Sequence, residues 1–174
     1  LLTVNATASA MSICPGNTTN LTSVVAGGTG SCSYSWSNGS LLSSQTVSPT
    51  STTNYILTVT DSMGCTAVDN VLITLFVPAV IALGNDTSIC QGDMLTLNAG
   101  TGFSSYLWQN GTTLQTLNAS VANQYFVSAI DANGCVVRDT LNLTINPLPV
   151  IGLNDTVKIC PGTSTLLLAN PGYT

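Results

Sequence analysis

The sequence predicts an all-β protein made of tandem small β-sandwich domains, arranged end to end and each closed by one disulfide. Three observations lead to this prediction. One pattern of elements occurs twice along the chain, short segments alternate apolar and polar residues, and cysteines recur at matching places in the two copies. The 174 residues suffice for one ordinary domain or two small ones.

The repeat consists of four elements that occur in the same order in both copies. The matching segments are 12–21 with 88–97, 34–39 with 106–111, 54–65 with 123–135, and 70–80 with 141–151. Self-similarity of this kind is the signature of a repeat architecture. A third copy of the first element lies at 158–167.

The domain boundaries follow from this repeat. We expect residues 1–8 to be the closing strand of a preceding repeat, and residues 9–80 and 81–150 to be two complete repeats. Residues 151–174 should then begin a truncated third repeat. We therefore expect the chain to be an excerpt from a longer polypeptide.

Within each repeat the residue pattern is typical of β-strands. Apolar and polar residues alternate in 19–25, 55–60, 94–99 and 141–146, with many β-branched residues, which indicates half-buried strands. Asp-Ser-Met-Gly at 61–64 and its counterpart Asp-Ala-Asn-Gly favour hairpin turns. We expect six or seven strands per sandwich.

Aromatic residues occupy equivalent places in the two repeats. Trp36 and Trp108 lie in the Tyr-x-Trp element, and Tyr55 and Tyr125 begin the next-to-last strand. We expect all four to pack in the cores, with the tyrosine hydroxyl bonded at a corner. The alternative for the tryptophans is an exposed platform that stacks on sugars.

The cysteines recur with the repeat. The first cysteine precedes the first core strand and the second follows the hairpin turn, so we expect the disulfides Cys14–Cys65 and Cys90–Cys135. Cys160 matches the first cysteine, and Cys32 has no counterpart. Because the chain has no histidine and no Cys-x-x-Cys, a zinc or iron–sulfur site is disfavoured. Disulfides in turn predict secretion to the extracellular space or cell surface.

The chain carries very little charge. Charged residues make up 5% of it, the net charge is −5, and Arg138 and Lys158 are the only basic residues. Nucleic-acid binding and adsorption to anionic membranes both need a basic surface, so neither is expected. The longest apolar stretch, 71–83, is too short to span a bilayer.

The motifs ICPG and ICQG, Tyr-x-Trp-x-Asn-Gly, and Asp-x-x-Gly-Cys followed by Asn-Pro-Leu-Pro resemble a known class of repeat. They are similar to the Ig-like or PKD-like repeats of large secreted Bacteroidota adhesins, the gliding-motility-associated class exported by the type IX system. The Trp-Asp-Phe-Gly-Asp-Gly signature of PKD domains is replaced here by YSWSNG and YLWQNG. The resemblance implies spacer or adhesive repeats without catalytic activity, and candidate O-glycosylation at Ser62, Thr140 and Thr156.

No residue set suggests an enzyme. Catalysis by a nucleophile and a base is hard to assemble without histidine, and Asp61 and Asp131 have structural tasks in their turns. No cofactor is expected, although Asp86, Asp93 and Asp155 lie near the domain joints, where calcium could bind. The alternative for Asp86 and Asp155 is that they cap turns in the matching Asn-Asp-Thr segments.

We therefore expect a structural or adhesive segment of a long extracellular surface protein or fibre. Its partners would be neighbouring repeats of the same chain, with surface glycans or other fibre subunits as further partners. The alternative is an array of carbohydrate-binding modules, for which Phe103 and Tyr173 are the spare aromatic residues. Ice binding is disfavoured because the threonines show no regular spacing.

Overall fold

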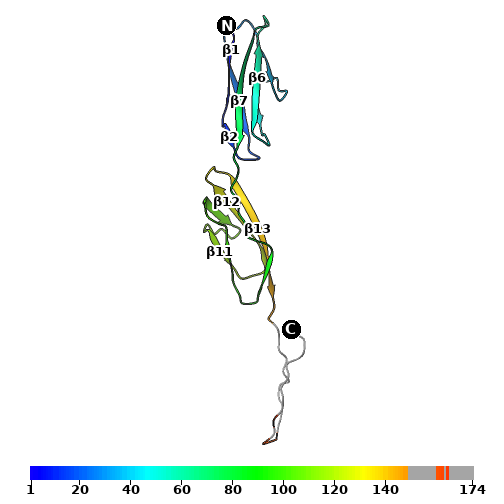
Figure 1. Ribbon diagram of the computed structural model, residues 1–174, viewed down its shortest axis with the longest axis vertical. Helices are drawn as coiled ribbons and strands as arrows, with labels where there is room; N and C mark the ends of the chain where they lie inside the picture. Colours follow the sequence, from blue (N-terminus) through cyan, green and yellow to red (C-terminus); the bar gives the residue numbers. More distant parts are fainter. Residues whose placement is uncertain (149–159, 163, 165–174) are drawn as a thin grey trace.

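The computed structural model describes residues 1–148, 160–162 and 164. Within this part of the chain there are thirteen β-strands and no helix. Figure 1 shows that the strands gather into two separate β bodies. The first contains β1 to β7 and the second contains β8 to β13, and each consists of two sheets. The predicted all-β sandwich class is therefore confirmed.

The first sandwich is built from a three-stranded and a four-stranded sheet. The smaller sheet has the order β1 (Thr3–Ala8), β3 (Thr19–Ala26), β5 (Ser44–Val47). The larger has the order β2 (Ser12–Ile13), β7 (Thr66–Leu75), β6 (Thr53–Thr60), β4 (Ser33–Trp36). All pairs are antiparallel except β2 with β7, which run parallel.

The second sandwich repeats this plan. Its larger sheet has the order β10 (Phe103–Trp108), β12 (Asn123–Asp131), β13 (Val136–Asn146), β8 (Thr87–Cys90). Its smaller sheet pairs β9 (Leu95–Asn98) with β11 (Thr116–Ala119). The short first strand β8 again runs parallel to the last strand, β13.

Each sandwich encloses its own hydrophobic core. One cluster of buried residues runs from Leu2 to Ile73 and the other from Ile81 to Leu143. Trp36 and Trp108 are each 2% exposed, and each indole Nε1 donates a 2.9 Å hydrogen bond to a backbone oxygen six residues ahead. The tryptophans are therefore core residues, as predicted, and not a sugar platform.

The two tyrosines are buried in the same cores. Tyr55 and Tyr125 lie at the start of β6 and β12, and both are buried. The hydroxyl of Tyr125 donates to the carbonyl of Val121 at 3.0 Å. This is the bonded corner position that the sequence predicts for that residue.

The prediction that residues 1–8 close a preceding repeat is wrong. β1 pairs antiparallel with β3 over its whole length, and Leu2 and Ala6 belong to the first core. The backbone N–H of Ala6 also donates to Asp69 Oδ2 at 2.7 Å. Alternation of apolar and polar residues identifies a strand but does not show which domain contains it. The pairing with β3 makes β1 the first strand of the first sandwich.

The alternation in β6 provides a test of the core assignment. Leu57 is fully buried, whereas its neighbour Ile56 is 44% exposed on the opposite face of the same strand. We expect Leu57→Ala to lower the free energy of unfolding by about 2–5 kcal/mol, because it leaves a cavity. Ile56→Ala should cost at most about 1 kcal/mol. Urea unfolding followed by tryptophan fluorescence measures both, and equal losses would contradict the assigned face.

Candidate functional site

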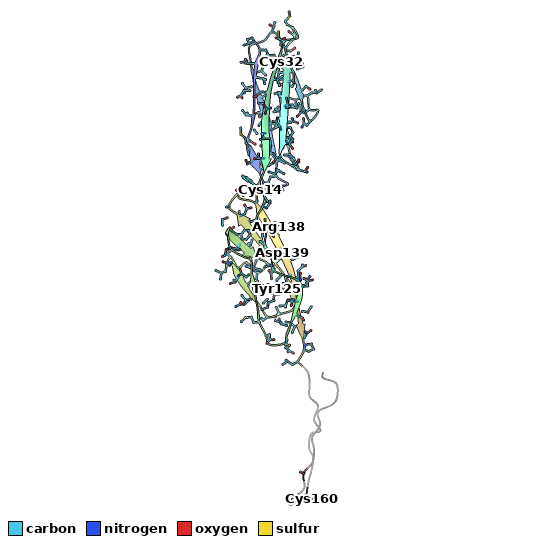
Figure 2. All side chains as sticks on the ribbon, in the orientation of Figure 1. Cys14, Cys32, Tyr125, Arg138, Asp139 and Cys160 are labelled. Carbon is cyan, nitrogen blue, oxygen red and sulfur yellow. A yellow bond between two sulfur atoms is a disulfide. The ribbon has the colours of Figure 1, made fainter. Side chains whose placement is uncertain are left out.

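One disulfide joins the two sandwiches. Cys14 lies directly after β2 in the first, and Cys135 directly before β13 in the second, 121 positions later in the sequence. Their Cα atoms are 5.5 Å apart. Cys135 is 1% exposed. Figure 2 shows Cys14 at the boundary between the two β bodies.

The predicted disulfides Cys14–Cys65 and Cys90–Cys135 are therefore wrong. Cys14 pairs with Cys135 instead, while Cys65 and Cys90 are exposed thiols. The cysteines occupy matching positions in the two sandwiches, but they do not pair within one sandwich.

Strand direction explains the error. Because β2 runs parallel to the end of β7, with Ile13 opposite Leu75, Cys14 lies beyond the far end of that ten-residue strand. Cys65 lies just before its beginning. Ten residues of strand span roughly 30 Å, whereas a disulfide needs Cα atoms within about 7 Å. Cys90 and Cys135 are separated in the same way by β13.

Asp131 holds the same boundary from the second sandwich. Its Oδ1 accepts hydrogen bonds from the backbone N–H groups of Asn133 at 2.8 Å and Cys135 at 2.9 Å, which closes the turn between β12 and β13. Its Oδ2 accepts from the N–H of Ala79 at 3.1 Å, in the segment that connects the sandwiches. One buried carboxylate thus fixes both the turn and the connection.

These hydrogen bonds favour the ionised carboxylate. The Cys135 amide, with those of Ala79 and Asn133, holds the pKa of Asp131 below its usual value, although partial desolvation opposes this shift. Asp61 occupies the equivalent turn of the first sandwich, and its pKa is lowered by bonds from Cys65, Thr29 and Met63. Both aspartates have the structural task in their turns that the sequence predicts.

The connecting segment is also attached to the second sandwich further along. Ile81 is buried in the second core, and the N–H of Leu83 donates to Asp139 Oδ2 at 2.8 Å. This bond matches the one between Ala6 and Asp69 in the first sandwich. We call Cys14, residues 76–83, Asp131 and Cys135 together the joint.

The residues considered for calcium do not gather at the joint. Asp86 accepts hydrogen bonds from the backbone and side chain of Asn142 on β13, and these bonds lower its pKa. Asp93 is exposed in the turn after β8, and Asp155 lies outside the described residues. In residues 1–148, 160–162 and 164, no three His, Cys, Asp or Glu side chains come together as a metal site.

The remaining candidate residues lie at different places on the surface. Ser62 and Thr140 are exposed, but the Ser62 hydroxyl donates to the carbonyl of Thr29 at 2.6 Å. Thr156 and Tyr173 lie outside the described residues. Phe103 packs against the second core and meets Tyr106 edge-on at 5.8 Å, so it is not a free aromatic platform. Cys32 is partly buried against the first core.

Sequence reasoning missed the joint because the connecting segment carries no unusual motif. The sequence signal for the disulfide is the position of the first and second cysteine of each repeat relative to its last strand. If the strand that leads to the first cysteine of a repeat runs parallel to the last strand, that cysteine and the cysteine before the last strand must lie at opposite ends of the repeat. Pairing between consecutive repeats then becomes the geometric solution.

Comparison with known proteins adds structural neighbours only. No protein-family model and no curated protein matches the chain. Among solved structures, the DIP-gamma Ig1 and Ig2 domains are 13% identical with a TM-score of 0.33, covering 81% of this chain and 97% of that one.

Two bacterial adhesins have similar scores. A 1.5-MDa bacterial ice-binding adhesin is 12% identical with a TM-score of 0.41, over 83% of this chain. A Ca²⁺-stabilised adhesin that helps an Antarctic bacterium bind ice is 16% identical with a TM-score of 0.40, over 88% of this chain. This chain spans 65% and 51% of those two chains. It is thus similar to Ig-like and bacterial adhesin domains.

The lowered pKa of Asp131 predicts how the second sandwich responds to acid. An unfolded aspartate has a pKa of about 3.9, so the stability from this carboxylate is fully present above that pH. It is lost as the pH falls through the lower pKa of the folded state. We therefore expect Asp131→Asn to lower the unfolding temperature at pH 7, with the difference from the unaltered chain narrowing only below about pH 4.

Asp93→Asn is the matched control, because Asp93 is an exposed carboxylate of the same sandwich. It should leave the unfolding temperature unchanged across this range. Calorimetric scans between pH 7 and pH 2 make the measurement. A constant difference between Asp131→Asn and the unaltered chain at every pH would contradict the electrostatic account.

Proposed function

We propose that this chain is a tandem array of Ig-like repeats and forms a non-catalytic structural or adhesive segment of an extracellular protein. The observation that carries the proposal is the Cys14–Cys135 disulfide, which connects two separate cores. A bond of this kind has no obvious catalytic use, but it fixes the relative orientation of two consecutive units. Such a constraint suits a structural segment whose domains must keep a fixed relative orientation.

The joint supports this proposal because it combines covalent and polar constraints. The disulfide joins the two sandwiches, and the Ala79–Asp131 and Leu83–Asp139 hydrogen bonds attach the connecting segment to the second sandwich. Independent domains linked by a flexible segment normally move relative to each other. A connection held in this way instead transmits the orientation of one sandwich to the next.

The surface also supports a structural or adhesive role. With only 5% charged residues, the exposed face consists mainly of hydroxyl, amide and apolar groups, a composition that tolerates close association. Exposed apolar side chains on the two sandwiches include Val24, Leu41, Leu107 and Leu114. Surfaces of this type suit lateral contacts in a fibre or attachment to another surface.

A secreted location is part of the proposal. Disulfides persist in oxidising compartments and are rare in the cytosol. In the part of the chain that the structure describes, no helix has the length and hydrophobicity to cross a bilayer. Export by the type IX system of Bacteroidota, and O-linked glycan at Thr140, follow from the sequence resemblance and belong to the proposal.

Small-angle X-ray scattering of the chain tests the array. We expect an elongated particle, because two separate cores are held end to end by a short joint. Cys14→Ser with Cys135→Ser should keep both cores but broaden the distribution of interatomic distances, since the covalent restraint between the sandwiches is lost. A compact particle in the unaltered chain, with the cores folded against each other, would refute the proposal.

Carbohydrate binding is a second candidate, favoured by one surface depression. A hollow of about 520 Å³ lies on the outer face of the second sandwich, lined by Leu107, Gln109, Phe126 and Arg138 among others. Phe126 is 45% exposed there. An aromatic ring beside amide and guanidinium donors can stack on a sugar and bond its hydroxyls.

A glycan array separates the two functions. If this depression binds sugars, the unaltered chain should bind defined glycans, and Phe126→Ala should reduce that binding at least tenfold. Val136→Ala alters an exposed apolar residue of the adjacent strand outside the lining and serves as the control. Absence of binding to every glycan, or equal binding by both variants, would exclude this depression as the sugar site.

A further inference from the structure

Cys65 and Cys135, the second cysteines of the two repeats, follow equivalent turns but differ in burial. Cys135 follows the turn between β12 and β13 and is 1% exposed, whereas Cys65 follows the equivalent turn between β6 and β7 and is exposed. Cys135 is bonded to Cys14 of the preceding sandwich, and the connecting segment meets the same turn through the Ala79–Asp131 hydrogen bond. Cys65 therefore lies on a surface of the kind that such a neighbour would cover.

The backbone around Cys65 already has the geometry of the bonded turn. The N–H of Cys65 donates to Asp61 Oδ1 at 2.9 Å, and the N–H of Cys135 donates to Asp131 Oδ1 at the same distance. In both turns the backbone N–H of the aspartate donates to the cysteine carbonyl at 3.0 Å. The backbone at the two cysteines is therefore held by the same hydrogen bonds, while the other carboxylate oxygen accepts from Thr29 at Asp61 and from Ala79 at Asp131.

Cys14 and Cys90, the first cysteines of the two repeats, have equivalent surroundings at the other end of each sandwich. Cys14 and Cys90 each follow an isoleucine that pairs with the end of the last strand, Ile13 with Leu75 and Ile89 with Ile145. Each cysteine carbonyl accepts a 3.0 Å hydrogen bond from the amide three residues ahead. Cys14 is bonded and partly buried, whereas Cys90 is an exposed thiol.

We propose that Cys14–Cys135 is one member of a repeating series in which the first cysteine of each repeat bonds the second cysteine of the following repeat. Cys90 then bonds the second cysteine of a following repeat, and Cys65 bonds the first cysteine of a preceding repeat. The partner surface is thus another repeat of the same kind. This inference rests on the proposed tandem array and specifies how its units are joined.

Bonding within a repeat cannot replace this scheme. Cys90 lies opposite Asn146, the last residue of β13, and Cys135 lies just before the first residue of that strand, so the eleven-residue strand keeps the two cysteines roughly 35 Å apart. Cys14 and Cys65 are separated in the same way by β7. The same geometry brings the end of one sandwich to the start of the next, as the observed disulfide shows.

The chemistry is thiol–disulfide exchange with an external disulfide as oxidant. The thiolate of one cysteine attacks that disulfide and releases one thiol. The second cysteine thiolate then displaces the other thiol and forms the Sγ–Sγ bond. The two cysteines lose two protons and two electrons in total, and the oxidant leaves as two thiols. Oxidised glutathione serves as the oxidant in the experiment below.

The test inserts a second copy of residues 77–146 directly after Asn146 and keeps the whole chain. This supplies the following repeat with the same connecting segment. The inserted copy carries Gln91→Asn and Val136→Ile, two exposed positions, so that its cysteine peptides differ in mass. The protein is folded with reduced and oxidised glutathione, and peptic peptides are mapped without reduction.

We expect Cys90 of the original repeat to bond Cys135 of the inserted copy, which is recognised by its changed peptide mass. Cys14 should remain bonded to Cys135 of the original repeat. Iodoacetamide labelling of that Cys90 should fall from complete in the 174-residue chain to undetectable. A reduced Cys90, or a bond between Cys90 and Cys135 of the same copy, would overturn the scheme. Cys90→Ser in the original repeat is the control and should leave the marked Cys135 reduced.

Small-angle X-ray scattering by the protein with the inserted repeat separates failure of the disulfide series from failure of the tandem array. An elongated particle that lacks the Cys90 bond overturns the disulfide series and leaves the tandem array intact. A compact particle refutes the array itself.

Discussion

The rest of the structure depends on one constraint: in each sandwich, the short strand that leads to the first cysteine pairs parallel with the last strand. β2 lies beside the end of β7, and β8 beside the end of β13. Each first cysteine is thereby carried to one end of its sandwich while each second cysteine stays in the turn at the other end. The covalent bond must then cross from one unit to its neighbour, and the connecting segment is drawn into the same place by Asp131.

Small β-sandwiches bury limited apolar surface and are marginally stable by themselves. The joint compensates because its bonds act on both units together. In the chain-entropy account, closing a loop as long as the one between Cys14 and Cys135 contributes about 5 kcal/mol. Asp131 adds a charge-assisted hydrogen-bond network to the same place. Stability and orientation therefore come from one small group of residues, and the wide polar surface remains available for contacts.

The sequence predicted those features that depend on local pattern. Trp36 and Trp108, the turns at Asp61 and Asp131, and the alternation in β6 could all be read directly, because each reflects burial or turn chemistry of neighbouring residues. Residues 1–8 were assigned to the wrong end of a sandwich, since alternation is the same in a first and a last strand. The disulfide was missed because it depends on strand direction, which neither spacing nor composition reports. In the connecting segment, the backbone N–H groups of Ala79 and Leu83 donate hydrogen bonds to aspartates of the second sandwich. The pattern of side chains in the sequence does not reveal bonds made by the backbone.

The position of the disulfide has a mechanical consequence. When the ends of the chain are pulled apart, tension that enters through β1 and β2 passes at Cys14 directly to Cys135 and leaves along β13. The chain between these two cysteines, which includes most of both cores, lies outside the loaded path. Fully extended it would release about 400 Å of slack, and a covalent bond must break before that happens. Under load the disulfide should therefore prevent residues 15–134 from extending, while β1, β2 and β13 carry the force.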